Sequence, residues 1–477
     1  MKKIVKIISF VTAIAVTVTA LGGCGKNESA TDNSQKKVKW LLGYTKPADH
    51  EKVMESLKAD IKEKTGIELE IMTFDNGSYG EKMNLILSSG DYFDICHTNS
   101  NLKTSYKTAV KKNLFYKLDD LLEGEYKDLK SEIPDFVWDT IKIDGGIYGV
   151  PSYQMMFQNI TATVGESLAK KYNFNTDSVD ELKDLESMLK VIKENEPDYI
   201  PFVPSWTPLG ITYQNVESQV YVRKDDPDMK LYLPYEAPEY IEYLEMVHDW
   251  YKKGYIAADA ATNNSTSNDK ITAFMCTNYK PGVEANEIVR YGEKKIHMEL
   301  SAPIVGPIQG QSAINAISAH SVNPESALEI LRLMYTDKDI YNKFCFGIEG
   351  EHYKKVGENR IEKLNDKYDL TVAWMFGNQF NAFLQPSQSD DVWEQTEKMN
   401  NEALKSNLTG FSVDVTNIRN EISAVSAVQG EYEKFLNYGV ENPHNHLEAY
   451  KMKLQKAGIE KIREEIQLQL DEWKKTK

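Results

Sequence analysis

From residue 38 onward, apolar positions follow the period of a strand and the period of a helix in turn. The pattern predicts strands at 38–42, 67–71 and 93–96, and helices at 49–65 and 81–89. Gly66 stands where a helix-ending glycine is expected, because glycine accepts the left-handed conformation common there. Strands that alternate with helices in this way predict an α/β layer with a mostly parallel sheet.

A second region of mixed pattern follows the turn signal Asp144-Gly145-Gly146, and Pro151 ends the predicted hairpin. Ser178 and Glu181 have the spacing of a capping box, which predicts the start of a helix. Further helices are predicted at 240–251 and from Asn323-Pro324 onward. From about residue 447 the chain is charged and mostly helical in pattern.

The N-terminus has the composition of an export signal. Lys2, Lys3 and Lys6 precede the apolar run 7–21, which is shorter than the roughly 20 residues that cross a ~30 Å hydrocarbon core. Leu21-Gly22-Gly23-Cys24 resembles a bacterial lipobox, in which cleavage precedes a cysteine that receives a diacylglyceryl group. We therefore predict a signal peptide at 1–23, lipidation at Cys24, and a flexible linker over 24–37.

Composition narrows the range of possible functions. The chain has 56 basic and 72 acidic residues and a net charge of −16, which would repel nucleic acid. Its 477 residues predict two or three domains. Once Cys24 is lipidated, Cys96, Cys276 and Cys345 are left, widely spaced and without a CxxC pair. We interpret these three as buried hydrophobic residues rather than as disulfides or metal ligands.

Candidate catalytic chemistry is sparse. The sequence has no GxSxG, HExxH, P-loop or glycine-rich dinucleotide motif. His444 and His446 lie close together, but no third ligand is evident, so we expect no metal, no cofactor and no catalytic residue.

Aromatic and amide side chains indicate binding instead. Rings with a polar handle suit ligands that are apolar on one face and hydroxylated around the rim, as sugars are. Such rings fall at predicted strand ends or in loops, at Tyr44, Tyr153, Trp206, Tyr213 and Tyr279. Two predicted strands run into Thr-Asn loops, which give Thr98, Asn99 and Asn278 as candidate contacts, since ligands bind beyond the carboxyl ends of such strands. Packing and turn chemistry are the structural alternatives for these residues.

Several segments resemble the family 1 extracellular solute-binding proteins, the ligand-catching subunits of bacterial ABC importers. These segments are LILSSGDYFDICHTN (85–99), GGIYGVPSYQ (145–154) and ITAFMCTNY (271–279). The C-terminal third resembles a Gram-positive lipoprotein subgroup with an extra domain of unknown function, through MYTDKDIYNKFCFGIEGEHY (334–353), WMFGNQF (374–380) and LQKAGIEKIREEIQLQLDEW (454–473). Sugar binders of this family often have tryptophan where this chain has Tyr279.

The resemblance implies a two-lobed α/β fold of the periplasmic-binding-protein type II, with a largely helical C-terminal extension. The expected N-terminal lobe is 38–152 plus 301–350, and the C-terminal lobe is 153–300 plus 351–477. Gln154 joins the candidate contacts through the segment that crosses between the lobes. The expected protein is a monomeric lipoprotein on the outer face of the cell membrane, which passes a small solute to an ABC permease. An oligosaccharide is the expected solute and a peptide the alternative. The other functions left open are a tethered glycosidase or lyase and a ligand sensor for a membrane kinase.

Overall fold

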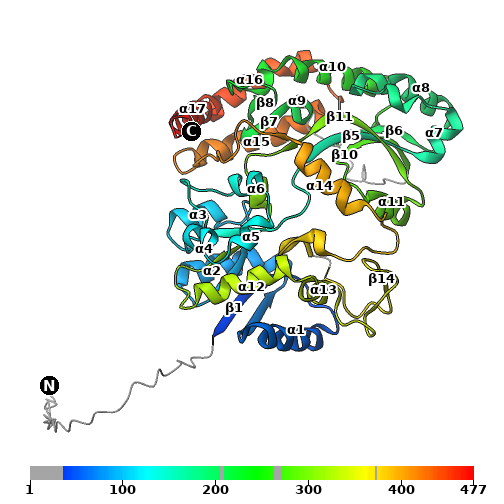
Figure 1. The fold of residues 1–477 in the computed structure, drawn as a ribbon. Coiled ribbons are helices and arrows are strands. Elements are labelled where there is room, and N and C mark those ends of the chain that lie inside the picture. Colours follow the sequence, from blue (N-terminus) through cyan, green and yellow to red (C-terminus); the bar gives the residue numbers. More distant parts are fainter. Residues whose placement is uncertain (1–35, 205–208, 263–270, 371–372, 477) are drawn as a thin grey trace, which may run out of the picture. The chain divides into compact units, whose positions relative to one another are not determined.

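The computed structural model describes residues 36–204, 209–262, 271–370 and 373–476 (Figure 1). The predicted lipidation site Cys24 and the predicted contact Trp206 lie outside these residues. None of the described helices combines the length and the apolar character that a bilayer crossing requires.

The first sheet has the strand order β2-β1-β3-β12-β4. Its strands are β1 (Lys37–Gly43), β2 (Glu68–Phe74), β3 (Ile95–Thr98), β4 (Gly149–Pro151) and β12 (Ile314–Ile317). β1 is parallel to β2 and β3, whereas β12 is antiparallel to β3 and β4. The chain therefore leaves this sheet after β4 and returns to it much later.

Helices of this region pack on the first sheet and around its edges. They are α1 (His50–Thr65), α2 (Asn76–Ser89), α3 (Tyr106–Lys111), α4 (Asp119–Glu123), α5 (Lys127–Ser131), α6 (Asp135–Asp139), α12 (Pro324–Thr336) and α13 (Lys338–Phe346). Gly66 ends α1 with a φ of 72°, as the sequence predicts. The core beneath them is anchored by the fully buried Trp40, whose indole N–H donates to Asn315 Oδ1 on β12 at 3.2 Å.

The second sheet has the order β15-β11-β5-β10-β6 and its own apolar core. Its strands are β5 (Gln158–Gly165), β6 (Ile200–Val203), β10 (Thr272–Thr277), β11 (Lys295–Val305) and β15 (Leu404–Lys405). A smaller sheet joins β7 (Tyr213–Glu217), β8 (Val220–Arg223) and β9 (Leu231–Tyr232). The helices of this part before residue 300 are α7 (Glu166–Tyr172), α8 (Glu186–Asn195), α9 (Leu209–Thr212), α10 (Pro238–Lys252) and α11 (Val283–Tyr291).

The C-terminal part supplies α14 (Val392–Glu402), α15 (Arg419–Leu436), α16 (Pro443–Ala457) and α17 (Ile459–Lys474). The apolar faces of α15, α16 and α17 are buried in the core of the second sheet. The largely helical C-terminal extension is therefore not a separate body, because it shares a core with the second lobe.

Two local predictions differ from the structure. The capping box lies three residues later than predicted, since the Asp184 carboxylate accepts from the Glu181 N–H at 2.8 Å and α8 begins only at Glu186. The predicted hairpin reduces to the turn, where Ile143 and Gly146 exchange backbone hydrogen bonds of 3.0 Å. Asp144 and Gly145 both have positive φ there, as a tight two-residue turn requires.

The lobe boundaries also fall elsewhere than predicted. β11 stays in the second sheet until Val305, so the boundary at residue 301 lies inside a strand. Tyr368, Leu370 and Phe376 are buried in the core of the first sheet, although the prediction places 351–477 in the second lobe. The sequence pattern marks apolar faces, but it does not show which of two cores a face joins.

Candidate functional site

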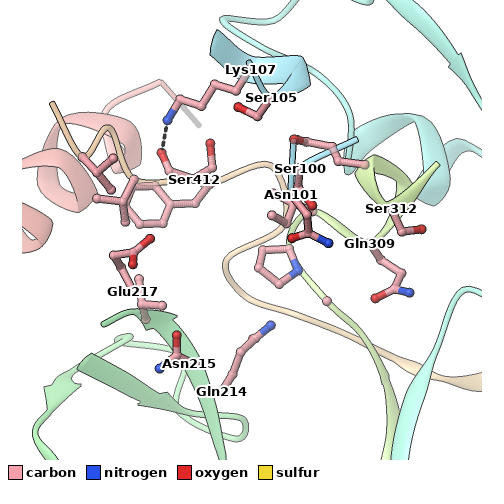
Figure 2. Close-up of a pocket in the computed structure, with 18 of the residues that line it drawn as sticks. Ser100, Asn101, Ser105, Lys107, Gln214, Asn215, Glu217, Gln309, Ser312 and Ser412 are labelled. Carbon is pink, nitrogen blue, oxygen red and sulfur yellow. Dashed lines mark hydrogen bonds between the residues drawn. The ribbon is translucent and has the colours of Figure 1, made fainter. Parts of the chain in front are cut away.

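A cavity of about 810 Å³ opens between segments that come from both sheets and from the C-terminal part. Figure 2 shows Lys107 and Ser105 on one side of it and Glu217, Asn215 and Gln214 across from them. The lining segments lie within 100–112, 158–160, 210–217, 304–312 and 411–419, and Lys224 and Asn278 complete the lining. Such a space, enclosed by segments remote in sequence, is the usual form of a small-molecule site.

The first side of the cavity is shaped by the turn after β3. The Asn99 side chain accepts hydrogen bonds from the backbone N–H groups of Asn101 at 2.8 Å and Leu102 at 3.0 Å. This turn brings Ser100 and Asn101 to the cavity. The Asn99 side chain therefore stabilises the backbone of the turn, and the residues after it present their polar groups to the cavity.

The second side includes Asn159, which is 2% exposed and lines the cavity. Its Oδ1 accepts from the Tyr279 N–H at 3.0 Å. Its Nδ2 has no hydrogen-bond partner in the described part of the chain. An unpaired buried amide costs free energy, and a ligand acceptor in the cavity would recover it.

Tyr213 and Gln214 extend the second side along β7. The Tyr213 ring is 1% exposed, and its hydroxyl donates to Glu239 Oε2 at 2.7 Å. Burial raises the pKa of Tyr213 to about 12. Gln214 Oε1 accepts from Ser406 Oγ at 2.6 Å, which fixes the amide at the cavity wall. Tyr213 thus lines the cavity with a ring that is almost fully buried, whereas Gln214 contributes a polar side chain to the wall.

The lining is rich in hydroxyl and amide groups, and it is more cationic than the protein as a whole. Five basic side chains line the cavity against two carboxylates, Glu217 and Asp414; the basic ones are Lys107, Lys111, Lys112, Lys224 and Arg419. Burial lowers the pKa of both Lys107 and Lys224 to about 8. Burial also raises the pKa of Glu217. Burial thus weakens the charged form of Lys107, Lys224 and Glu217, and the cavity combines many neutral hydrogen-bonding groups with a few charged ones.

The structure brings two of the predicted contacts, Tyr213 and Asn278, to the cavity. Asn99 and Tyr279 lie beside it, as the backbone hydrogen bonds above show. The other four described candidates are not among the lining residues: Tyr44, Thr98, Tyr153 and Gln154. Whether any of these residues contacts a ligand stays a prediction.

Those four candidates have structural partners or burial of their own. The Tyr44 hydroxyl lies 2.9 Å from His50 Nε2, and Tyr153 packs on Phe380 with ring centroids 4.7 Å apart. The Gln154 amide donates to the Trp374 carbonyl at 3.5 Å. Thr98 is 1% exposed. These contacts account for the buried rings without a ligand.

Sequence reasoning missed most of the lining. Lys107, Gln309 and Ser412 belong to a short helix, a 3₁₀ turn and an irregular segment, none of which carries a motif. Their convergence depends on the return of β12 to the first sheet and on the docking of the C-terminal helices. One signal was available, namely the density of short polar residues in SVDVT (412–416) just before a helical pattern.

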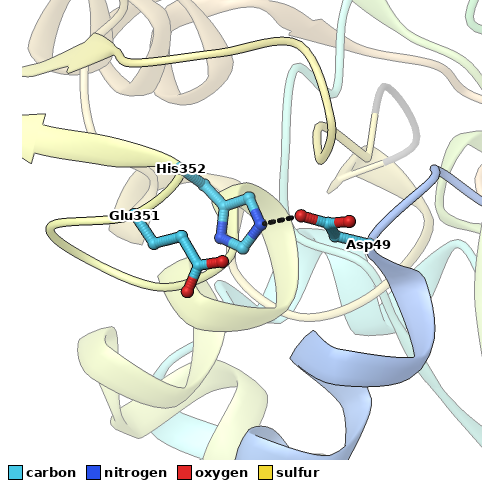
Figure 3. Close-up of side chains that lie close together, drawn as sticks. All are labelled: Asp49, Glu351 and His352. Atoms are coloured by element: carbon cyan, nitrogen blue, oxygen red, sulfur yellow. Dashed lines mark hydrogen bonds and ion pairs between the residues drawn. The ribbon is translucent and has the colours of Figure 1, made fainter.

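Asp49, Glu351 and His352 form a cluster whose ligand-type atoms lie within 4.8 Å of one another (Figure 3). The Ile348 N–H donates to His352 Nδ1 at 3.0 Å, so a neutral ring carries its proton on Nε2, which faces Asp49 Oδ2 at 3.3 Å. Glu351 is also paired with Lys52. Because both ring nitrogens are already used, the cluster is suited to joining α1 to the 351–352 segment rather than to holding a metal.

The chain contains the domain described as bacterial extracellular solute-binding protein, matched over residues 56–346. It therefore belongs to that family. A domain of unknown function matches residues 407–475, which hold α15, α16 and α17.

Two relatives are similar to this chain over most of its sequence. A carbohydrate ABC transporter substrate-binding protein of Streptococcus pneumoniae is 28% identical, over 98% of this chain and 97% of its own. Lipoprotein LipO of Bacillus subtilis is 24% identical, over 72% of this chain and 73% of its own.

Among solved structures, the N-glycan transport solute binding protein NgtS of S. pneumoniae is 26% identical, with a TM-score of 0.81 over 92% of this chain and 98% of that one. Structures of NgtS in complex with Man1GlcNAc and Man5GlcNAc have TM-scores of 0.69 and 0.66, at 26% identity. They cover 92% and 93% of this chain and 99% of their own. The predicted two-lobed solute-binding fold is confirmed by these likenesses.

Proposed function

We propose that this protein captures an oligosaccharide in the cavity between its lobes and delivers it to an ABC importer. The observation that carries the proposal is the lining itself, in which side-chain amides and hydroxyls from both lobes surround about 810 Å³. Sugars present dense donors and acceptors, which such groups match without the cost of burying a full charge. The carbohydrate and N-glycan cargo in the descriptions of the relatives supports the same class of ligand.

The structure represents the open form in this proposal. The TM-score between this chain and NgtS is 0.81 for one NgtS structure, but it is 0.69 and 0.66 for the two NgtS structures with a bound glycan. Because the sequence of NgtS is common to all three, the scores report differences in its conformation. A ligand that touches both lobes would favour closure by its higher affinity for the closed form.

The protein works as a lipoprotein at the outer face of the membrane in this account. The lipobox-like LGGC ending at Cys24 supports the anchor, and the lipoprotein LipO is a relative. Acylation holds the binding protein close to its permease, which raises the effective concentration of one for the other.

Binding without turnover is part of the proposal. A glycosidase needs two carboxylates that flank the scissile bond. Among the described lining residues, the carboxylates are those of Glu217 and Asp414. Asp414 Oδ1 accepts hydrogen bonds from the N–H of Thr416 at 2.9 Å and from its hydroxyl at 2.7 Å. Oδ1 of this carboxylate is therefore engaged in its own turn, which leaves only its other oxygen for a ligand.

The test is a thermal-shift screen of the purified protein against Man1GlcNAc, Man5GlcNAc, kestose, oligogalacturonates and short peptides, followed by calorimetry on every hit. A true ligand raises the melting temperature by mass action. Asn159→Ala removes a candidate hydrogen bond to the sugar and should weaken binding about five- to tenfold; because it also removes the acceptor of the Tyr279 N–H, its melting temperature is measured as well. Asn420→Ala, at an exposed position outside the cavity, is the matched control.

Binding of peptides but no sugar would overturn the choice of cargo. Release of new reducing ends from any glycan in the panel would overturn the proposal of binding without turnover.

A further inference from the structure

The C-terminal domain of unknown function supplies part of the cavity surface. That domain comprises residues 407–475. Residues 411–416 and Arg419, the first residue of α15, line the cavity together with residues of both sheets. The domain is thus placed where it can touch whatever the lobes enclose.

The segment 411–416 is held from its outer side by α17. The Asp414 N–H donates to Gln469 Oε1 at 2.7 Å, and the Gln469 amide donates back to the Asp414 carbonyl at 2.9 Å. Just before the segment, the Gly410 N–H donates to the Pro307 carbonyl at 2.9 Å. A wall fixed on both sides loses little conformational entropy when a ligand binds to it.

The inner side of the segment faces the first lobe. The Lys107 ammonium on α3 donates to the Ser412 carbonyl, as the dashed line in Figure 2 shows. The Asp414 carboxylate acts electrostatically on the same ammonium. The C-terminal domain therefore meets both lobes at the cavity.

Two charged groups on this wall are available to a ligand. The Arg419 guanidinium has no hydrogen-bond or ion-pair partner in the part of the chain that the structure describes. Thr416 engages Asp414 through Oδ1, and the second carboxylate oxygen has no hydrogen-bond donor among the described residues. A guanidinium and a carboxylate make strong, directional hydrogen bonds to hydroxyl groups.

We infer that the C-terminal domain is a specificity element of the ligand site, in which Asp414 and Arg419 hydrogen-bond hydroxyl groups of the bound oligosaccharide. This inference rests on the proposed function, because it assigns the recognition of one part of that ligand. It gives the domain a role in choosing the cargo in addition to its place in the second core.

The experiment compares Asp414→Asn, Arg419→Gln and the double variant with the unchanged protein by calorimetry. The probes are Man5GlcNAc, Man1GlcNAc, kestose and an oligogalacturonate. Asp414→Asn keeps an oxygen that can accept from Thr416, so the turn is preserved, and Arg419 is exposed, so neither change should disturb folding. Lys434→Gln removes an exposed charge from the same helix α15 outside the cavity and is the matched control.

We expect each single variant to weaken the best probe about ten- to hundredfold, with an unchanged melting temperature in the absence of ligand. The control should stay within about twofold. The rank order of the probes should also change, which a purely structural role would not produce.

Unchanged affinity and rank order in the double variant would overturn this inference and leave oligosaccharide capture intact. Failure of the unchanged protein to bind every probe would instead contradict the proposed function, and the inference would fall with it.

Discussion

The Lys107 ammonium donates a hydrogen bond to the carbonyl oxygen of Ser412, which lies 305 residues further along the chain. This bond joins α3 of the first lobe to the C-terminal domain at the cavity. Burial lowers the pKa of this lysine from an ordinary value of 10.5 to about 8. The burial of this ammonium at the cavity wall therefore makes the free energy of unfolding depend on pH.

The sign of this dependence follows from proton binding. Between about pH 8 and pH 10.5 the unfolded chain keeps a proton on Lys107 that the folded protein releases, so the free energy of unfolding rises with pH across this window. Lys107→Met lacks this contribution. Relative to wild type, the variant should gain most in free energy of unfolding below pH 8, and this gain should shrink toward pH 10.5. Urea unfolding of the pair at several pH values, with Lys434→Met as a charge-loss control, measures it. Parallel curves for wild type and Lys107→Met would show that the ammonium is well solvated.

Removal of the two aromatic candidates Tyr213 and Tyr279 should have different effects on stability and on binding. Tyr213 is 1% exposed, so Tyr213→Ala should cost about 3–5 kcal/mol of stability. Tyr279 is half-buried against His297, with ring centroids 5.0 Å apart, so its removal should change stability much less. If Tyr279 stacks on a sugar, Tyr279→Ala should weaken binding roughly five- to thirtyfold. Melting temperature and calorimetric affinity, measured on both variants, test the distinction. If both variants lost the same amount of melting temperature and Tyr279→Ala kept its affinity, Tyr279 would be a packing residue and not a ligand contact.

The cluster of Asp49, Glu351 and His352 should not depend on a metal. Both nitrogens of the His352 ring already take part in hydrogen bonds, to the Ile348 N–H and to Asp49. A metal present at a hundred times its Kd would stabilise the fold by about 2.7 kcal/mol. We expect the melting temperature to be the same with a chelator, with calcium and with zinc. A rise with either metal that His352→Gln abolishes would contradict this account of the cluster.

The predicted anchor rests on one thiol. Cys24→Ser should abolish incorporation of labelled fatty acid because Cys24 is the predicted acylation point. Membrane association alone is a poor measurement, since an uncut signal could also hold the protein at the membrane. The oligosaccharide affinity of the variant serves as the control for folding. Undiminished labelling of the serine variant would rule out the lipid anchor at this position.

The sequence predicts the alternating elements of the first lobe well. Predicted strands at 38–42 and 67–71 correspond to Lys37–Gly43 and Glu68–Phe74, and the predicted helix 49–65 corresponds to His50–Thr65. These elements carry strong local patterns, because each buries one face or is buried throughout. Local periodicity is sufficient information in such cases.

The site was harder to predict for a physical reason. Its wall is assembled from segments that meet only when β12 returns to the first sheet and α17 docks on the second core. Tyr44 and Tyr153 look like ligand rings in the sequence, but the structure buries them against His50 and Phe380. Lys107 and Arg419, which line the cavity, look like ordinary surface charges in the sequence. The spacing of residues along the chain does not predict such long-range contacts.

An oligosaccharide bound in this cavity should contact both lobes. Hydrogen–deuterium exchange with and without a saturating hit from the glycan screen measures such contact segment by segment. We expect slower exchange on both sides, in 100–112 of the first lobe and in 158–160 and 214–217 of the second. Protection confined to one lobe, or to segments that do not line the cavity, would rule out binding between the lobes.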